Sequence, residues 1–348
     1  MATASPAPST APKPEGRLIV FWRVLRANPL SLFGFILVAV ICGTALIVLV
    51  APHLIVPFGA EQQTIAHNAP PSWRHPLGTD NLGYDIYSNV MLALPLDLGI
   101  GIAIAGSALL LGGVLGLVAG FYDTPGTVAG GLSVAIMRLT DIFLSFPSLI
   151  LALALTRILG LGIGPTALAI TLTWWPYYVR LVRGEVLAVK HLPYISAARA
   201  AGVTENRILL RHVLRNILEP IVVYFTLDIG TVLVTYSTIG FIGIASKYPG
   251  PQPEWGAMLA FYQSSGSANV YPWLVLGPGA AIFVTVLAFS LLGDGLRDIL
   301  DPRTRRAFVR STGTHDPPAE TPTAAVAPEP IEPAPVVGIG AADPGGVP

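Results

Sequence analysis

The sequence predicts an all-helical integral membrane protein, because the chain is strongly apolar and its charges are sparse between its two ends. Of its 348 residues, 53% are hydrophobic and 11% are charged, and the mean hydropathy is +0.65. A soluble domain carries roughly 25% charged residues, whereas positions 27–296 hold only 12 acidic and 11 basic residues. This composition excludes a soluble enzyme. The net charge of zero also excludes a nucleic-acid-binding protein, which needs a basic surface.

Six apolar stretches are long enough, or nearly long enough, to cross a membrane. A helix needs roughly 20 apolar residues to span a hydrocarbon core about 30 Å thick. The fourth stretch is the shortest and contains Pro176, which a transmembrane helix tolerates when neighbouring groups satisfy the carbonyl that it frees. We expect transmembrane helices at about residues 30–50, 96–121, 139–159, 166–181, 221–244 and 273–292.

The basic residues orient these helices, since cytoplasmic loops are enriched in Lys and Arg. Placing both termini in the cytoplasm puts 17 of the 20 Lys and Arg residues there and leaves only Arg74, Arg157 and Lys247 outside. We therefore expect a multi-pass membrane protein with both termini cytoplasmic. Its transmembrane domain covers residues 27–303, between a largely disordered segment at 1–26 and a Pro- and Ala-rich disordered tail at 304–348.

No familiar motif for catalysis or metal binding is present. The histidines form no His-Glu-x-x-His pattern, and the sequence lacks the Gly-Lys pair of a phosphate-binding P-loop. The single cysteine, Cys42, allows neither an internal disulfide nor a thiolate metal cluster. We expect no enzymatic activity, no bound metal and no cofactor. If ATP drives the protein, the ATP must bind to another chain.

The most informative segment is the long cytoplasmic loop at residues 183–219. Helix-forming residues occupy 194–201, Gly202 interrupts them, and Thr204 can cap a following helix. In that second helix the apolar residues of 208–214 share a face opposite three arginines. Such a loop either lies at the lipid headgroups or offers a short helix of small residues that fits a groove on a cytoplasmic partner.

This loop resembles the "EAA" motif of permease subunits from binding-protein-dependent ABC importers. Ala197, Ala198 and Gly202 keep the spacing of that motif, and Ser196 stands where its acidic residue is expected. Further segments are similar to the C-type subunits of the dipeptide, oligopeptide and nickel permease family, and the likeness covers about residues 20–303. These segments are 28–29, 75–85, 141–147, 254–259 and 293–302.

The resemblance implies the fold of a type I ABC importer permease, with a peripheral first helix and a five-helix core, located in the bacterial cell (inner) membrane. It implies that the chain forms, with a homologous permease subunit, the translocation path for di- and oligopeptides, or for nickel or another metal chelate. Two ATP-binding-cassette ATPase subunits would bind ATP, and an extracytoplasmic solute-binding protein would deliver the cargo. The loop that couples to the ATPase comprises Tyr194, Ser196, Ala197, Ala198, Ala201, Gly202, Ile208 and Leu209.

Several single residues are candidates for a direct role in transport. Asp228 lies in the middle of the fifth span, where a charge is costly and usually faces a cavity or a partner. It either meets the amino group or cation of a solute in the translocation path, or it forms hydrogen bonds within a subunit interface. Four aromatic residues at 174–178 either anchor the fourth span at the membrane surface or line a binding site. The candidates for docking of the binding protein are His75, Asp80, Glu254 and Trp255.

The main alternative is a secondary transporter, which works without an ATPase. That class predicts inverted internal repeats and charged relays inside the spans. The sequence contains no convincing repeat, and Asp228 is the one well-buried charge that we expect in the middle of a span. The importer is therefore the favoured interpretation.

Overall fold

A computed structural model describes residues 28–124 and 126–300, with side chains to residue 298. The segments predicted to be disordered, 1–26 and 304–348, lie outside the described residues. Within the described part the chain is helical apart from turns and loops, and β-structure is limited to two isolated bridges, Gln63 with Tyr84 and Thr79 with Asp85. The all-helical fold predicted from the sequence is confirmed.

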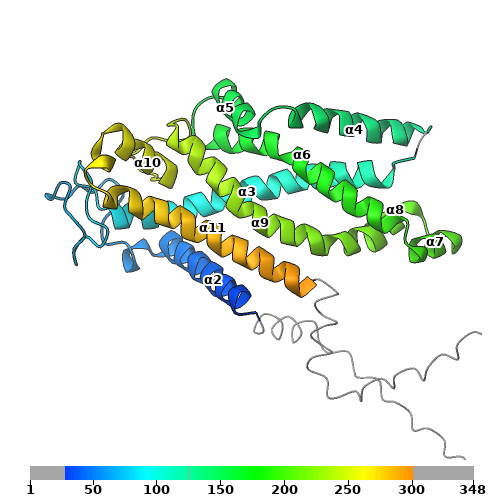
Figure 1. The fold of residues 1–348 in the computed structure, drawn as a ribbon, viewed down its shortest axis with the longest axis horizontal. Coiled ribbons are helices and arrows are strands. Elements are labelled where there is room, and N and C mark those ends of the chain that lie inside the picture. The colour runs from blue at the N-terminus through cyan, green and yellow to red at the C-terminus, as the bar shows by residue number, and fades with distance from the viewer. Residues whose placement is uncertain (1–27, 125, 301–348) are drawn as a thin grey trace, which may run out of the picture. The chain divides into compact units, whose positions relative to one another are not determined.

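The helices follow one another with short connections, except for two longer loops at residues 55–85 and 242–254. We name the first of these the outer loop, after the orientation that the sequence predicts. Figure 1 shows α3, α6, α9 and α11 running alongside one another, with α2 beside α11. The α-helices are α2 (Pro29–Val50), α3 (Ile86–Phe121), α4 (Val128–Leu144), α5 (Ser148–Leu159), α6 (Ile163–Lys190), α7 (Pro193–Ala200), α8 (Glu205–Arg207), α9 (Leu214–Phe241), α10 (Trp255–Ser264) and α11 (Trp273–Leu300). Short helical turns at Pro52–Leu54 (η1), Ile208–Val213 (η2, a π-helix) and Ser267–Asn269 (η3) complete the list.

Four helical segments among the described residues are long and apolar enough to cross a membrane. These are α2, α3, the continuous segment from α8 through α9, and α11; a fifth results if α4 and α5 together make one span. The helix α6 has the length of a span but does not belong to this set, so the predicted count of six spans stays a prediction. The described chain thus contains several apolar helices long enough to cross a membrane, as the sequence predicts.

The expected third span, residues 139–159, differs most from the structure. The chain breaks at 145–147, and α4 and α5 meet at an angle of 90°. Pro147, which has no amide hydrogen for a helix bond, lies at this break and precedes α5. The helix α4 is held to α6 by an ion pair between Arg180 and Asp141, at 2.8 Å, and by an edge contact of Phe143 with Trp175. The bend therefore follows from the proline, and side-chain contacts keep α4 beside α6.

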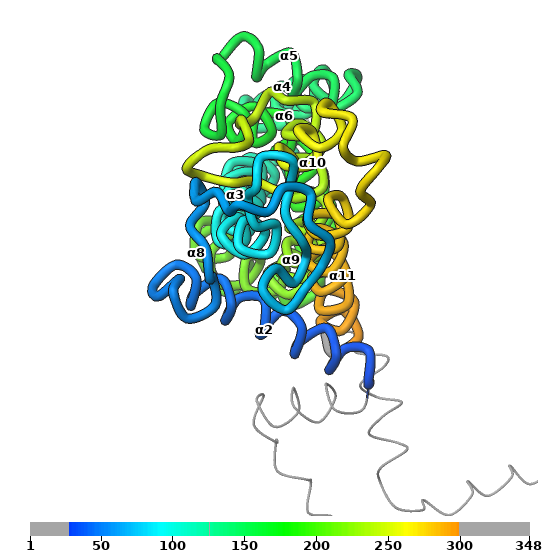
Figure 2. Tube along the Cα trace, turned by 90° about the vertical axis from the view of Figure 1, so that its left-hand side faces the viewer, coloured from blue at the N-terminus to red at the C-terminus, as the bar shows by residue number. Residues whose placement is uncertain are grey.

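Glycines set the close contact between α3 and α6. A Cβ atom at Gly112 would overlap the carbonyl oxygen of Trp175, and one at Gly116 would overlap that of Val179. Small residues let membrane helices approach closely, and these two glycines do so here. By contrast, α2 lies at the edge of the bundle, against α11 and α3, as the tube in Figure 2 shows. A peripheral first helix agrees with the resemblance.

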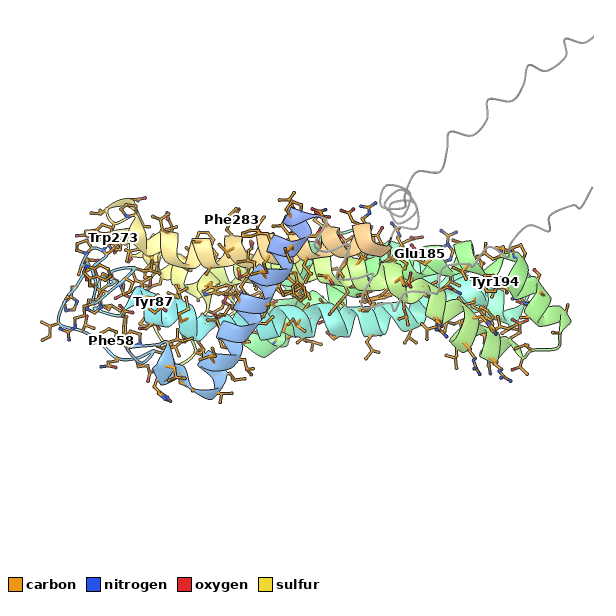
Figure 3. The ribbon with its side chains drawn as sticks, turned by 90° about the horizontal axis from the view of Figure 1, so that it is seen from below. Phe58, Tyr87, Glu185, Tyr194, Trp273 and Phe283 are labelled. Carbon is orange, nitrogen blue, oxygen red and sulfur yellow. The ribbon has the colours of Figure 1, made fainter. Side chains whose placement is uncertain are left out.

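The two ends of the bundle differ in structure. Figure 3 places Phe58, Tyr87 and Trp273 at one end, where the outer loop and the start of α11 lie. Tyr194, in α7, and Glu185 lie toward the opposite end. The candidate site residues therefore fall into three places: the end of the bundle that carries the outer loop (the outer end), the middle of α6 and α9, and the loop around α7.

Candidate functional site

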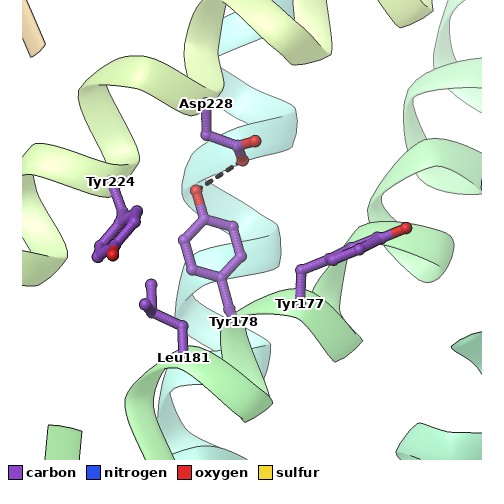
Figure 4. Close-up of a pocket in the computed structure, with 5 residues that line it drawn as sticks. All are labelled: Tyr177, Tyr178, Leu181, Tyr224 and Asp228. Carbon is purple, nitrogen blue, oxygen red and sulfur yellow. Dashed lines mark hydrogen bonds between the residues drawn. The ribbon is translucent and has the colours of Figure 1, made fainter. Parts of the chain in front are cut away.

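A pocket of about 220 Å³ lies between the middle of α6 and the middle of α9. The helix α6 supplies Tyr177, Tyr178 and Leu181, and α9 supplies Tyr224 and Asp228 (Figure 4). Three of the five lining side chains are aromatic, and Asp228 is the only acidic one. The structure thus places the carboxylate predicted from the sequence beside an open space, which favours its interpretation as a cavity residue.

Two side chains of α6 hold the Asp228 carboxylate in place. Trp174 Nε1 donates to both carboxylate oxygens, at 2.9 and 3.0 Å, and the Tyr178 hydroxyl donates to Oδ2 at 2.7 Å. All three hydrogen bonds come from neutral groups. The ion pairs among the described residues involve other acidic side chains, so no Lys, Arg or His in that part of the chain neutralises Asp228.

The close contact of α3 with α6 positions these two donors. A Cβ atom at Gly112 would come within 2.7 Å of Tyr178 Cβ, so α3 packs directly beneath the tyrosine. Trp174 and Tyr178 are four residues apart and therefore share one face of α6, and the Trp174 ring also contacts that of Tyr177 at a centroid distance of 5.6 Å. The glycines of α3 thus contribute to the geometry around Asp228.

The aromatic residues at 174–178 lie deeper along their helix than the sequence indicates. We expect the fourth span to end near residue 181, but α6 continues to Lys190. The charges of Arg180 and Arg183, at which the apolar run ends, are accommodated by ion pairs with Asp141 and Asp123. The aromatic cluster consequently lies in the middle of α6, beside Asp228, and this position favours a lining role over anchoring.

The predicted ATPase-coupling loop forms the expected helix, turn and helix. The helix α7 ends at Ala200, and Gly202 adopts a φ of +77°, a conformation that glycine adopts without strain. Thr204 precedes α8 with extended backbone, but its side chain makes no capping bond. Instead its carbonyl accepts from the amides of Arg207 and Ile208. The local fold of the loop agrees with the prediction from its sequence.

One side of this loop is buried and the other is open. Ile195, Ile208 and Leu209 pack with Phe121 and Val186 in a small apolar cluster beneath α7. Ala198 is partly buried against that cluster. The other residues of the predicted coupling loop, which are exposed, are Tyr194, Ser196, Ala197, Ala201 and Gly202. The structure therefore brings Tyr194 and four small residues to the surface, whereas Ile208 and Leu209 pack in the cluster.

The four docking candidates have buried side chains. His75 is 6% exposed, and its Nδ1 lies 2.8 Å from Asp85 Oδ2, while its ring stacks on Phe58. Asp85 also accepts from the amide of Ser88 at 2.8 Å and so caps α3. These contacts fold the outer loop onto the start of α3. Direct contact of His75 with another protein therefore has no support in this structure.

Asp80, also buried, organises the same loop. It accepts from the amides of Leu82 and Tyr84 at 2.9 and 2.8 Å, and from the Tyr248 hydroxyl at 3.1 Å. Burial raises the pKa of Asp80, and these hydrogen bonds oppose the rise. Burial also raises the pKa of Tyr248. Asp80 thus links the loop after η1 to the loop before α10, which is a structural role.

A second acidic cluster joins α3, α9 and α10. The Asp97 carboxylate accepts from the Trp255 amide at 3.0 Å, and Glu254 accepts from the Ser246 hydroxyl at 2.6 Å. Both acidic side chains are fully buried, and burial raises the pKa of Glu254 to about 7. Asp97 was not expected as a site residue, although an acidic residue within an apolar run is a signal for one. Asp228 is therefore not the most deeply buried charge.

Trp255 completes this cluster. Its indole Nε1 donates to the carbonyl of Val90 at 3.0 Å, and the whole side chain is 1% exposed. Among the described residues, no group of three or more His, Cys, Asp or Glu side chains is placed to hold a metal ion. We therefore interpret the cluster of Asp97 and Glu254 as a structural connection between helices at the outer end of the bundle.

Comparison with known protein families shows to which family the chain belongs. The profile described as "Binding-protein-dependent transport system inner membrane component" matches residues 112–306, and that of the "N-terminal TM domain of oligopeptide transport permease C" matches residues 17–71. The chain belongs to the family of binding-protein-dependent transport system inner membrane components. It is accordingly a permease subunit of an ABC importer, and the ATPase of such an importer is a separate chain. The family implies a partner permease as well.

Curated relatives cover most of the chain. The dipeptide transport system permease protein DppC of Alkalihalophilus pseudofirmus is 36% identical, over 86% of this chain and 96% of the relative. The glutathione transport system permease protein GsiD of Pectobacterium atrosepticum is 37% identical, over 77% and 88%. The probable D,D-dipeptide transport system permease protein DdpC of Escherichia coli is 35% identical, over 80% and 90%. A solved structure of the inward-facing MetNI methionine ABC transporter aligns with a TM-score of 0.47 at 20% identity, over 61% of this chain and 98% of that one.

Proposed function

We propose that the chain, with a second permease subunit, forms the translocation path of an importer for short peptides. The observation that carries this proposal is the cargo named for its relatives: a dipeptide, glutathione or a D,D-dipeptide. Each of these is a short peptide with a free α-amino group. The chain matches these relatives over about four fifths of its length, including both α6 and α9, whose residues line the pocket beside Asp228.

The exposed side of α7 is the proposed contact with the ATPase. It presents Ser196 and Ala197, whose short side chains leave a low surface that a groove on a partner can accept, and the exposed Ala201 and Gly202 follow directly. The apolar cluster below α7 fixes the loop to the ends of α3 and α6, so that a push on α7 moves those helices. Two ATPase subunits, one for each permease subunit, follow from the pairing of two such loops.

The proposed orientation places α7 and both termini in the cytoplasm. The positive-inside rule supports this, because the loop after α6 exposes Arg199, Arg207, Arg211 and Arg215. The start of α2 and the end of α11 lie on one side of the bundle, since Asn28 Nδ2 donates to Asp298 Oδ2 at 3.0 Å.

The outer end is then the face that receives the binding protein. Four buried side chains support this face from within and do not contact the binding protein themselves: His75, Asp80, Glu254 and Trp255. Direct contacts fall to exposed side chains of the same loop. Ile65 and Trp73 are fully exposed there, and exposed aromatic residues are common in protein interfaces.

Purification of the tagged, full-length chain from its own membrane tests the assembly. Mass spectrometry of the purified material should recover a second permease, an ATPase and a binding protein. Ala197→Trp adds a large side chain on α7 and should remove the ATPase while keeping the second permease. Val128→Trp, at the exposed start of α4, is the matched control and should keep both. Retention of the ATPase by Ala197→Trp at the wild-type level contradicts the proposed contact.

Uptake into proteoliposomes tests the cargo. The importer recovered with its binding protein should accumulate radiolabelled Ala-Phe when ATP is supplied to the ATPase. A nickel–histidine chelate serves as the competing cargo, since metal chelates are the other class that the family resemblance implies. If Ala-Phe does not accumulate under these conditions, the peptide assignment is wrong.

A further inference from the structure

We propose that the pocket beside Asp228 binds the primary ammonium group of the cargo. The proposal rests on the proposed function, because it identifies which part of a peptide the translocation path recognises. It is carried by three observations on the described residues: a carboxylate without a cationic partner, aromatic walls around it, and an open space of limited volume.

The charge of Asp228 is the first of these observations. Its three hydrogen bonds come from an indole and a phenol, which orient the carboxylate but do not neutralise it. A carboxylate offers about four acceptor positions, so at least one remains for a further donor. In a membrane interior a charge is costly unless an opposite charge pairs with it. A cationic group that enters the pocket therefore gains both a hydrogen bond and an ion pair.

The aromatic walls are the second observation. Tyr177, Tyr178 and Tyr224 flank Asp228 in Figure 4. Electron-rich aromatic faces attract a cation that lies within about 6 Å of the ring centroid. They do not attract a carboxylate, so the pocket favours the amino end of a peptide over its carboxyl end.

The volume is the third observation. Pockets that enclose a whole small-molecule ligand usually measure roughly 300–1,000 Å³, and this one measures about 220 Å³. It therefore accommodates the end of a peptide rather than the whole of it. Side chains beyond the first residue would remain in the path, which suits a permease whose relatives are named for different peptides.

Equilibrium dialysis of the purified importer complex in nanodiscs, without its binding protein, tests the site directly. The probes are Ala-Phe and benzylammonium, which carry a primary ammonium group, and N-acetyl-Ala-Phe, which does not. The wild-type complex should retain the two ammonium probes and not the acetylated peptide. Asp228→Asn keeps the shape and an acceptor for Trp174 and Tyr178 but removes the charge, and it should weaken retention about tenfold or more.

Thr226→Val is the matched control. Thr226 is buried on the same helix, and among the described residues its hydroxyl bonds only to the carbonyl of Val222, so this variant should bind like the wild type. Equal retention of Ala-Phe and its acetylated form overturns the proposal, as does failure of the wild type to retain either ammonium probe. The probe comparison decides the question even if Asp228→Asn does not assemble. Because dialysis requires no transport, a failed ammonium site is distinguishable from a failed peptide assignment, which the uptake assay reports.

Discussion

Asp228 and the Asp97–Glu254 pair use the same chemical group in two different ways. The Asp228 carboxylate is half-buried, bonds to side chains of one neighbouring helix, and borders a pocket. Asp97 and Glu254 are fully buried, and Asp97 accepts from the backbone amide with which α10 begins. The comparison shows that a backbone partner makes a buried carboxylate a connection between helices. Neutral side-chain partners beside open space leave it able to receive a ligand.

The crowding around the Asp97–Glu254 pair supports this distinction. A Cβ atom at Gly240 or Gly256 would overlap the Glu254 carboxylate, so two glycines leave just enough room for that side chain. Among the described residues, one oxygen of Asp97 and one of Glu254 lack a hydrogen-bond partner. The Glu254 side chain also repels a charge on Asp97. Such a site stabilises α10 best when its total negative charge is small.

The largest expected effect on folding stability comes from removing the charge of Glu254. Its pKa is about 7 in the folded protein and 4.5 ordinarily, so the folded state binds the proton more tightly between these values. Stability is therefore greatest below about pH 4.5 and falls as the pH rises through 7. At 1.36 kcal/mol per pH unit the loss approaches about 3 kcal/mol. Glu254→Gln should remove this loss, as the unfolding midpoints of the purified protein at pH 5 and pH 8 would reveal.

Glu61→Gln is the control for that measurement, because Glu61 is an exposed acid of the outer loop. It should keep the difference between pH 5 and pH 8 that the wild type shows. If Glu254→Gln retains the same difference, another group causes the pH dependence. The charge of the Asp97–Glu254 pair then does not control the stability of the fold.

A second prediction tests the support of the Asp228 site. Gly112→Ala places a Cβ atom against the backbone of Trp175, which cannot move without shifting α6, and overpacking of this kind costs about 1–3 kcal/mol. Trp174 and Tyr178 would move with α6 and weaken their bonds to Asp228. We expect a lower unfolding midpoint together with reduced uptake of Ala-Phe.

The neighbouring residue supplies the control. A Cβ atom at Gly113 would meet only Leu109 of its own helix, at an ordinary contact distance of 3.6 Å. Gly113→Ala should therefore be neutral or slightly stabilising, since alanine favours the helix over glycine by about 1 kcal/mol. Equal destabilisation by both variants would show that the α3–α6 contact does not support the site.

A third, smaller effect is expected from Tyr178→Phe. The variant loses the 2.7 Å hydrogen bond to Asp228, and a single hydrogen bond contributes about 1 kcal/mol to stability. The aromatic wall and the charge remain, so dialysis should show a modest loss of ammonium binding, well below that of Asp228→Asn. Loss as large as that of Asp228→Asn would mean that the orientation of the carboxylate matters more than its charge.

Local patterns in the sequence predicted the features that depend on local chemistry. The helix and glycine turn of the α7 loop follow from small helix formers ended by Gly202. The position of Asp228 in the middle of its helix follows from the apolar residues around it. Family resemblance, rather than spacing, provided the functional class.

Features that depend on distant contacts escaped prediction. The polar residues of the outer segments suggested an exposed surface, but Asp80 bonds to Tyr248 across 168 positions of sequence. The bond from the Trp255 amide to Asp97 spans 158 positions, which made Asp97 unrecognisable as a partner of Glu254. The length of α6 was underestimated because its ion pairs, such as Arg183 with Asp123, are not visible in the sequence. Burial of polar residues is thus the property that sequence patterns described least well.

The smallest expected effect concerns an acid that is neither buried nor beside a pocket. Glu205 pairs with Arg199 at 2.8 Å in the α7 loop, and both side chains are more than 40% exposed. Exposed ion pairs contribute about 0.2–1 kcal/mol and weaken with salt. Arg199→Ala should lower the unfolding midpoint only slightly, and less at high salt. A loss as large as that of Gly112→Ala would show that this ion pair, rather than the apolar cluster below α7, holds the loop in place. In that case the exposed fraction of a carboxylate would not tell whether the carboxylate stabilises the fold.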